Sequence, residues 1–512
     1  MVGGKQEVAG LEFSPDISPN RGHLGNVVAL GLLLPIFVFL ILAVILWKFS
    51  IDDVAISYRY AQYLAQGAGL TWNPGRPPVE GYSNFLWVLI LAGGSTCGFD
   101  IETFSKVAGV ICGLGVLGLL YAVSRRLAGE RRFWWLPPLI VAACPVWALW
   151  AVSGLELPLV GFWLVLIIYS LTCPPRQRIW LMSVCMCGLC LSRPEGAVIA
   201  VVVPLFGLVI DRELSRKDRL TIYGIPLLVS LICVVGLFAF RMWYFGAPVA
   251  NTVYAKFSGD LPSAGKVASW VFFGLPFFAA FVVAAARQKH ERYWPVYQVA
   301  LLLVFLQMIL VLPVSPVMFM QHRYLIPFFP LLALAAPVVL DRPAAFRRWA
   351  AVAGAVVTLI WSQQQWPSVS EAYKKEQSYC QRHQCVVDKL ARLPGRPVIA
   401  LLDAGRIPYW SGLPAVDIWG LCDSRIARAG FSAQAIWDSP LGMPDVYIMS
   451  ADTVSGGVNP RLGFDGLISR DLTFQQTYRL WDVCPGEYYY GYAILLNRAW
   501  ARREGVEFRR PQ

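Results

Sequence analysis

The chain has 512 residues, of which 57% are hydrophobic and only 15% charged, whereas an ordinary soluble domain has about 25% charged residues. The apolar residues form long uninterrupted stretches of the kind that a bilayer core requires, which excludes an ordinary soluble protein. The net charge of +12 would suggest a nucleic-acid partner in a soluble protein, but the Lys and Arg residues lie in short clusters between apolar segments. We therefore expect a membrane protein without a nucleic-acid partner.

Residues 1–25 are polar and are expected to form a cytoplasmic tail. The apolar segment that follows is too long for a signal peptide and has no small-residue cleavage site, so it is interpreted as an uncleaved anchor. Hydropathy predicts about 11 transmembrane helices in a domain that covers 26–366. The expected spans are 27–47, 104–124, 134–151, 157–171, 179–191, 196–210, 222–243, 267–286, 295–313, 324–340 and 349–364.

Basic clusters fall in alternate gaps between these spans and set the topology. By the positive-inside rule those gaps are cytoplasmic, so the N-terminus is inside and the first outer loop covers 49–103. Segment 85–98 is apolar, but counting it as a span would place every basic cluster outside. We therefore interpret it as a re-entrant or juxtamembrane helix buried on protein. The basic residues are Arg125, Arg126, Arg131, Arg132, Arg176, Arg178, Arg212, Arg216, Lys217, Arg219, Arg287, Lys289, Arg292, Arg342, Arg347 and Arg348.

The first outer loop begins with two adjacent carboxylates, Asp52 and Asp53. Near a membrane boundary such a pair is desolvated and self-repelling, so one pKa should be raised. A carboxylate of this kind can act as a general base on a sugar hydroxyl, with Asp53 preferred because it lies farther from the span. The pair could also bind a divalent cation through its oxygens. The structural alternative is a helix cap, since Asp is a common N-cap residue.

Further polar and aromatic residues gather in the outer loops. Arg193 and Glu195 could form only a local ion pair beside Pro194, and single outer basic residues often contact lipid headgroups. As a set, however, guanidinium groups, carboxylates and aromatic rings suit a phosphate-linked sugar. The candidate substrate-binding residues are Tyr58, Arg59, Glu80, Tyr82, Glu156, Arg193, Glu195, Tyr254, Lys256, His322 and Arg323.

After residue 366 the composition becomes polar, and 367–512 are expected to form a small extracytoplasmic α/β domain. Stretches 397–403 and 445–450 are typical of strands, and 371–393 and 424–429 of helices. Four cysteines in this region suggest two disulfides in an oxidising compartment. Proximity suggests Cys380–Cys385 and elimination leaves Cys422–Cys484, although spacing alone does not fix the connectivity. A metal site that uses His383 and these thiols is the alternative.

Several segments resemble the GT-C superfamily of polyprenyl-phosphate-sugar glycosyltransferases, and more narrowly the bacterial arabinofuranosyltransferase branch typified by the mycobacterial terminal enzyme. The most specific segment is DDVAISYRYA at 52–61. The resemblance implies a large first outer loop, a short helix like 85–98 along the membrane, and catalysis by a first-loop acid, here Asp52 or Asp53. The other segments are GLTWNPG at 69–75, VEGYSNFLW at 79–87, SGLE at 153–156, RPEG at 193–196, YFG at 244–246, NTVYAK at 251–256, HRY at 322–324, DAGRIPY at 403–409 and DIWGLCD at 417–423.

The function expected from this resemblance is transfer of a sugar, with D-arabinofuranose preferred, from a polyprenyl-phosphate donor. The acceptor would be a cell-envelope glycan or a surface protein on the outer side of a bacterial inner membrane. An aminoarabinose or mannose donor is the alternative within this class. A lipid-linked-sugar flippase is a second hypothesis, but it would predict internal repeats and midplane charges, and the sequence has neither. A non-catalytic receptor is a third, against which the Asp52–Asp53 pair argues.

Overall fold

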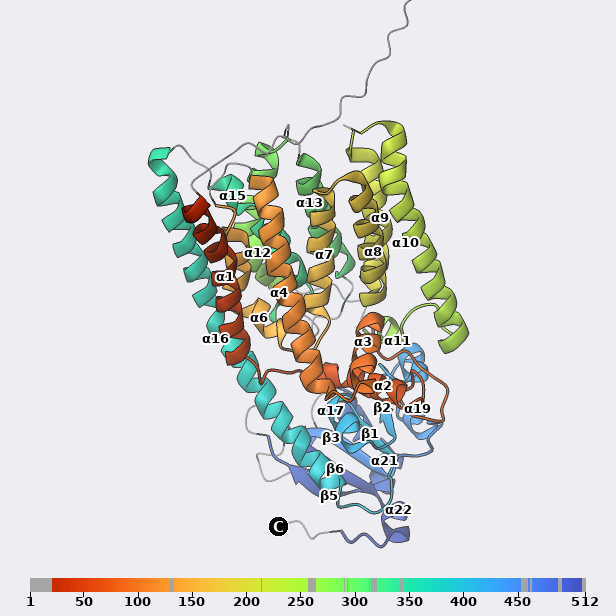
Figure 1. The fold of residues 1–512 in the computed structure, drawn as a ribbon. Coiled ribbons are helices and arrows are strands. Elements are labelled where there is room, and N and C mark those ends of the chain that lie inside the picture. The colour runs from red at the N-terminus through yellow and green to blue at the C-terminus, as the bar shows by residue number, and fades with distance from the viewer. Residues whose placement is uncertain are drawn as a thin grey trace, which may run out of the picture.

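The computed structural model describes residues 21–128, 133–212, 214–256, 264–289, 291, 293–312, 314, 320–340, 344–452, 459–460, 463–486 and 490–508. A helical bundle forms the upper part of the molecule in Figure 1, and a smaller α/β domain lies below it. Helix α16 (Ala344–Leu390) runs from the bundle into the lower domain and connects the two. Most of the expected N-terminal tail lies outside the described residues.

The bundle helices match most of the expected spans. Predicted span 134–151 is instead two short helices, α5 (Leu136–Ala142) and α6 (Pro145–Ala151), because a proline within a helix removes a backbone donor. Predicted span 324–340 is likewise divided into η2 (Ile326–Phe328), α14 (Phe329–Ala333) and α15 (Ala336–Val339), each with a proline in its first turn. The remaining bundle helices are α1 (Arg21–Ile45), α4 (Ile101–Ala128), α7 (Leu157–Leu171), α8 (Pro175–Ser192), α9 (Pro194–Ile210), α10 (Arg216–Phe245), α12 (Ala264–Arg287) and α13 (Trp294–Leu310).

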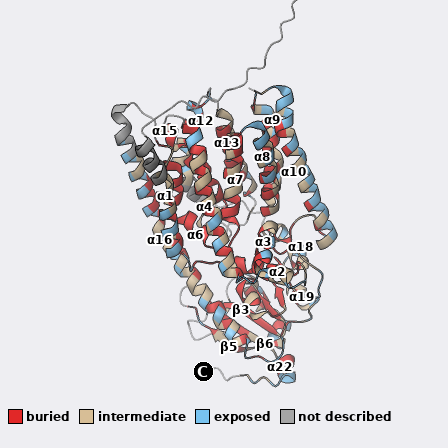
Figure 2. Cartoon of the chain, in the orientation of Figure 1, coloured by how far each residue is buried: buried red, intermediate tan, exposed pale blue. Residues whose placement is uncertain are grey.

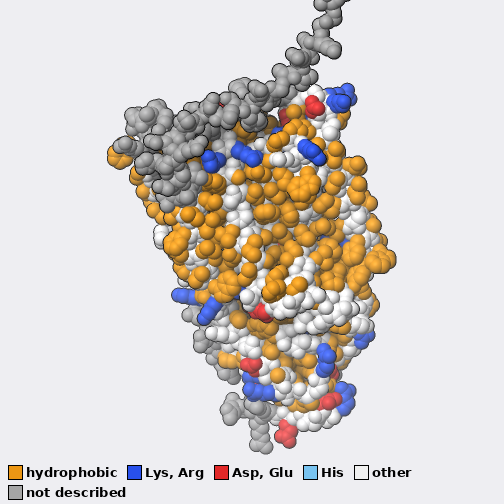
Figure 3. Space-filling view, in the orientation of Figure 1, with side chains coloured by type: hydrophobic (Ala, Val, Ile, Leu, Met, Phe, Trp, Pro, Cys, Tyr) orange, Lys and Arg blue, Asp and Glu red, His pale blue; other side chains and the backbone are white. Residues whose placement is uncertain are grey.

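The surface of the bundle is apolar. Hydrophobic side chains cover this face of it, while charged groups lie at its upper end and on the lower domain (Figure 3). Large apolar side chains are exposed on it, for example Val44 at 73% and Trp243 at 80%. An apolar surface of this extent is unfavourable in water but favourable in contact with lipid. The bundle is therefore the membrane part of the protein. Among the described residues, two helices, α4 and α10, are long and apolar enough to cross a bilayer by themselves, so the count of about 11 spans stays a prediction.

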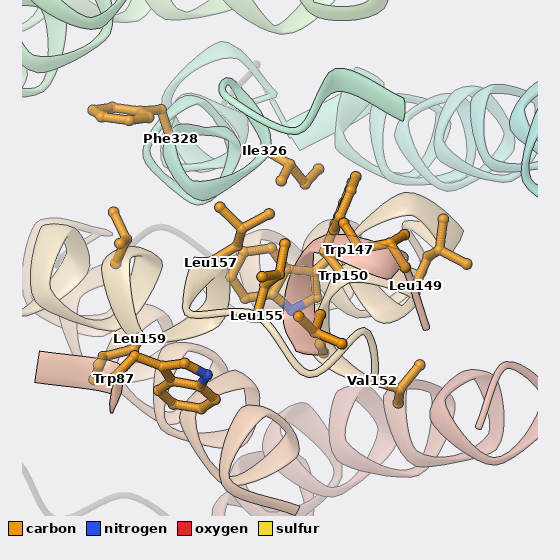
Figure 4. Packing of buried hydrophobic residues seen from close by; sticks show 14 of the residues in the cluster. Trp87, Trp147, Leu149, Trp150, Val152, Leu155, Leu157, Leu159, Ile326 and Phe328 are labelled. Carbon is orange, nitrogen blue, oxygen red and sulfur yellow. The ribbon is translucent and has the colours of Figure 1, made fainter. Parts of the chain in front are cut away.

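The interior of the bundle is built around large aromatic rings. Trp147, Trp150 and Trp87 are almost fully buried and belong to one hydrophobic cluster with Leu155 and Ile326 (Figure 4). Buried residues line the inward faces of the bundle helices (Figure 2). One close approach requires glycine: a Cβ on Gly109 in α4 would lie 2.2 Å from the carbonyl oxygen of Ala151 at the end of α6. The short α6 is thereby held directly against α4.

A layer of short helices lies between the bundle and the lower domain. It contains α2 (Asp52–Ala65), α3 (Phe85–Thr96), α11 (Asn251–Lys256) and α17 (Arg406–Ser411). Segment 85–98, predicted as a short helix, forms α3 within this layer. The indole of Trp87 in α3 donates to the carbonyl oxygen of Gly154 at 2.9 Å, which anchors α3 on the bundle.

The lower domain contains a mixed sheet in the order β2-β1-β3-β6-β5, with β4 paired to β3. Strand β1 is parallel to β2 and β3, with Ile399 opposite Ala415 and Val446, whereas β6 is antiparallel to β3 and β5. Both predicted strands and both predicted helices of this region are present. The elements are β1 (Ile399–Leu401), β2 (Ala415–Asp417), α18 (Ser424–Ala429), α19 (Ala433–Trp437), β3 (Val446–Asp452), β4 (Asn459–Pro460), α20 (Phe464–Ile468), α21 (Leu472–Thr477), β5 (Tyr478–Cys484), β6 (Gly491–Asn497) and α22 (Arg498–Arg503).

The disulfide connectivity predicted from the sequence is wrong. The bond joins Cys385 to Cys484, so it ties α16 to β5, and Cys380 and Cys422 are free thiols. Cys380 and Cys385 lie on the same helix, where five residues rise about 7.5 Å, more than a disulfide spans. The alternative of a thiol metal site is not supported, because no cluster of three or more His, Cys, Asp or Glu side chains placed for a metal occurs in the described part of the chain.

Candidate active site

Asp53 forms the centre of the candidate site. It lies in the first turn of α2, where a helix N-terminus favours a carboxylate. Its Oδ2 accepts from Nη1 of Arg323 at 2.7 Å, and its side chain is 29% exposed while that of Arg323 is 7% exposed. Burial alone would raise the pKa of Asp53, but the charges of Arg323 and Lys256 outweigh it and the pKa is lowered. Asp53 is therefore an ionised carboxylate between two cations.

These three residues line one recess at the junction between the bundle and the lower domain. Its volume is about 340 Å³, including space open to solvent. Polar groups come from α2, from the loop before α3 and from α11. The polar residues of the lining are Asp53, Ser57, Tyr82, Ser83, Asn84, Glu156, Thr252, Lys256 and Arg323. Tyr82 and Thr252 are buried, and their hydroxyl groups have no hydrogen-bond partner within the described part of the chain.

A chain of buried charges extends the site behind Arg323. Glu156 accepts from Arg193 Nη1 at 2.6 Å and from Asn84 Nδ2 at 2.8 Å, and Arg193 also contacts Glu195 at 2.5 Å. Burial would raise the pKa of Glu156, but Arg193 and Arg323 lower it overall. Because both of its carboxylate oxygens are occupied, Glu156 is less suited than Asp53 to accept a proton.

The loop that carries Arg323 has an unusual backbone. Gln321 and His322 both have positive φ, at 46° and 56°, which costs energy for residues other than glycine and therefore needs support from the surroundings. The indole of Trp150 donates to the Gln321 carbonyl at 2.8 Å, and Gln307 donates to that of Tyr324 at 3.0 Å. Burial lowers the pKa of His322 to about 4, so its imidazole is neutral at physiological pH. The side chain of His322 is not among those that line the recess.

Asp52 points away from this recess, toward the lower domain. Its carboxylate accepts the backbone N–H groups of Gly405 at 2.9 Å and Arg406 at 2.8 Å, at the start of α17. It also lies 3.4 Å from Nδ1 of the buried His383. Burial raises its pKa, against the opposing charge of His383. The two adjacent aspartates therefore have different environments, and the contacts of Asp52 are structural.

Several other predicted site residues serve the packing of the first loop. Arg59 is 1% exposed and donates to the carbonyl oxygens of Trp72, Pro408 and Leu413, so it joins α2 to the lower domain. Two further contacts fix the same loop: Tyr58 bonds Ser105 at 2.7 Å, and Glu80 forms a bidentate pair with Arg241 at 2.8 and 3.0 Å. Tyr254 is 37% exposed and lies under the guanidinium of Arg428.

Residues that the sequence analysis missed complete the recess and its support. Asn84, Ser57 and Thr252 line the recess, and Arg241 holds Glu80. Arg241 had a signal in the sequence, because a charge within an apolar span usually has a buried partner. The other three are small polar residues within segments 52–61, 79–87 and 251–256, and only those segments as wholes marked them in the sequence.

The chain has the GT-C fold. It is similar to ArnT from Cupriavidus metallidurans, solved with bound undecaprenyl phosphate, with a TM-score of 0.56 and 15% identity over 93% of this chain and 98% of that one. The apo structure of ArnT gives a TM-score of 0.55 and 14% identity over 89% of this chain and 97% of that one. The arabinosyltransferase EmbB from Mycobacterium smegmatis scores 0.39 at 13% identity and covers 89% of this chain and 47% of that one, which is too distant to support an inference.

Sequence comparison adds one match. Residues 371–503 match a family model described as Domain of unknown function (DUF8728), which corresponds to the end of α16 and the lower domain. No curated protein matches the chain in sequence. The structural match to ArnT thus covers most of the chain, whereas the family model covers only its last part.

Proposed function

We propose that the chain transfers a sugar from a polyprenyl-phosphate donor to an acceptor hydroxyl in the Asp53 recess. The observation that carries the proposal is the ionised carboxylate of Asp53 between Arg323 and Lys256, at one end of a GT-C bundle. The ArnT structure with bound undecaprenyl phosphate supports a lipid phosphate as the donor carrier. The buried hydroxyls of Tyr82 and Thr252 are available for the hydroxyl groups of a sugar.

In the proposed reaction, Lys256 and Arg323 bind the donor phosphate through charge-assisted hydrogen bonds. The acceptor oxygen bonds to the anomeric carbon as the bond from that carbon to the phosphate oxygen breaks. The lipid phosphate leaves with the bonding electrons, and the acceptor proton passes to Asp53. A phosphate at Arg323 brings negative charge beside Asp53 and raises the pKa of this carboxyl, so donor binding makes Asp53 a better base.

The sugar is proposed to be D-arabinofuranose, with aminoarabinose or mannose as alternatives. The acceptor is proposed to be a cell-envelope glycan or surface protein outside a bacterial inner membrane, with the lower domain on that side. We also propose that Asp53 can bind a divalent cation. Asp52 is already occupied by backbone N–H groups, so such an ion would be held by Asp53 and the donor phosphate rather than by the aspartate pair.

The test is purified protein in lipid nanodiscs with polyprenyl phosphates carrying D-arabinofuranose, aminoarabinose or mannose. Release of free polyprenyl phosphate that depends on an acceptor is the expected result, and the donor with the highest kcat/KM identifies the sugar. The assay is repeated with a chelator and with added Mg²⁺ to test the cation. Failure to release the lipid phosphate from any donor would contradict the proposal, and movement of intact donor across vesicles would favour the flippase instead.

A further inference from the structure

A second and larger cavity lies on the lower domain side of α2. Its volume is about 1130 Å³ including open solvent, against about 340 Å³ for the Asp53 recess. One wall is the end of α2, through Gln62 and Tyr63, with Gln66 just after it, and the opposite wall is α17, through Tyr409 and Trp410. This cavity is here called the α2–α17 groove.

The walls of the groove are fixed relative to each other. Arg59 lines the groove and donates from α2 to the carbonyl oxygens of Pro408 and Leu413, which lie before and after Tyr409 and Trp410 in the chain. Arg396 donates to the carbonyl oxygen of Gly412 at 2.9 Å at the groove's edge. A binding surface held in this way loses little conformational entropy when a ligand binds.

The lining has the chemistry of a sugar-binding surface. Three half-buried aromatic rings, those of Tyr63, Tyr409 and Trp410, present faces on which the apolar faces of sugar rings can stack. The amides of Gln62 and Gln66 can both donate to and accept from hydroxyl groups. Among the described residues that line the groove, arginine occurs but aspartate and glutamate do not. This favours a neutral or anionic ligand.

A peptide fits this groove less well. Peptides commonly bind by adding a strand to a free sheet edge, and β2 is an edge strand that borders the groove. The side-chain amide of Asn73 already occupies that edge: it donates to the carbonyl oxygen of Ala415 at 2.9 Å and accepts from its N–H at 3.0 Å. The backbone groups that a peptide would use at Ala415 are therefore taken.

We infer that the α2–α17 groove binds the glycan chain of the acceptor at a distance from the reacting hydroxyl, an inference that rests on the proposed function. Asp53 and Tyr63 are ten residues apart on the same helix, about 15 Å along its axis. An acceptor of several sugar residues can reach both sites, whereas a disaccharide in the Asp53 recess cannot. The groove thus gives the enzyme a preference for long acceptors.

The test compares Trp410→Ala and Gln66→Ala with the matched control Gln476→Ala, an exposed glutamine on α21. The probes are a fluorescent arabinofuranosyl hexasaccharide, mannohexaose and a neutral decapeptide, and binding is measured without donor. At least one hexasaccharide should bind wild type and the control, with affinity reduced about tenfold in Trp410→Ala and restored by Trp410→Phe. In turnover, the KM of that hexasaccharide should rise while kcat and the KM of a disaccharide are unchanged.

Because the binding assay needs no donor, its outcome is separate from that of the proposed reaction. Equal binding to wild type and the correctly folded Trp410→Ala variant would overturn the inference. Absence of binding to both hexasaccharides, or displacement of a bound hexasaccharide by the decapeptide, would overturn it as well.

Discussion

Replacement of Asp52 by alanine should weaken the attachment of the lower domain rather than the chemistry. The carboxylate accepts two backbone N–H groups at the start of α17, at 2.9 and 2.8 Å. Hydrogen bonds to a charged group contribute about 1.5–3 kcal/mol each, so the two amount to about 3–6 kcal/mol. Burial of the ionised carboxylate opposes this, as its raised pKa shows. A net loss of about 3 kcal/mol is therefore expected for Asp52→Ala.

The assay is thermal unfolding of the purified protein in one fixed detergent, followed by protease sensitivity of the lower domain. A loss of about 3 kcal/mol corresponds to a Tm lower by about 6–12 °C for a unit of this size. Gly405→Ala should act similarly, because its Cβ would lie 2.1 Å from the Asp52 carbonyl oxygen. Asp438→Ala, on the exposed surface, is the control and should change stability by less than about 0.5 kcal/mol. The reasoning is refuted if Asp52→Ala unfolds at the same temperature as this control.

Three further results are expected. Burial raises the pKa of Glu376 to about 7, so the folded protein holds this proton more tightly than the unfolded chain does. The resulting stabilisation is complete below the pKa of Glu376 in the unfolded chain and is lost as pH rises through 7. The free energy of unfolding should therefore fall by up to about 3 kcal/mol between pH 5 and pH 8, and Glu376→Gln should abolish this fall. Non-reducing peptide mapping should recover Cys385 linked to Cys484, and Cys484→Ser should cost about 2–5 kcal/mol; a Cys380–Cys385 peptide would contradict the structure. Arg241→Ala should lower the free energy of unfolding by about 3–5 kcal/mol, because it leaves Glu80 buried and unpaired. Replacement of both Arg241 and Glu80 by leucine should recover most of this loss. Equal denaturation midpoints for Arg241→Ala and wild type would exclude the pair as a stabilising contact.

The sequence was sufficient for features that depend on composition and chain order. Apolar stretches located most bundle helices, and the alternation of basic clusters marked 85–98 as a short helix rather than a span. The same topology placed Asp53, Lys256 and Arg323 on one side of the membrane, and the structure brings all three into one recess. The breaks within 134–151 and 324–340 coincide with prolines, whose effect on a helix is local and was available from the sequence.

The direction of a side chain around its helix axis and contacts between distant segments could not be predicted from composition and chain order. Asp52 and Asp53 are neighbours in sequence, but successive helix residues differ by about 100° in direction, so one faces α17 and the other the recess. Arg59 carries a charge suited to phosphate, yet three backbone carbonyls from distant segments use its donors. The partner of Cys385 lies 99 residues away, which spacing cannot reveal.

The role of Asp53 is tested most directly by the single-turnover rate of Asp53→Asn with a bound polyprenyl-phosphate sugar and an acceptor. Asparagine keeps the size of the side chain but cannot take the acceptor proton, so the rate should fall about 10²–10⁴-fold while the donor still binds Lys256 and Arg323. Asp438→Asn serves as the control for a surface aspartate and should react at the wild-type rate. A folded Asp53→Asn protein that turns over at the rate of this control would contradict the account.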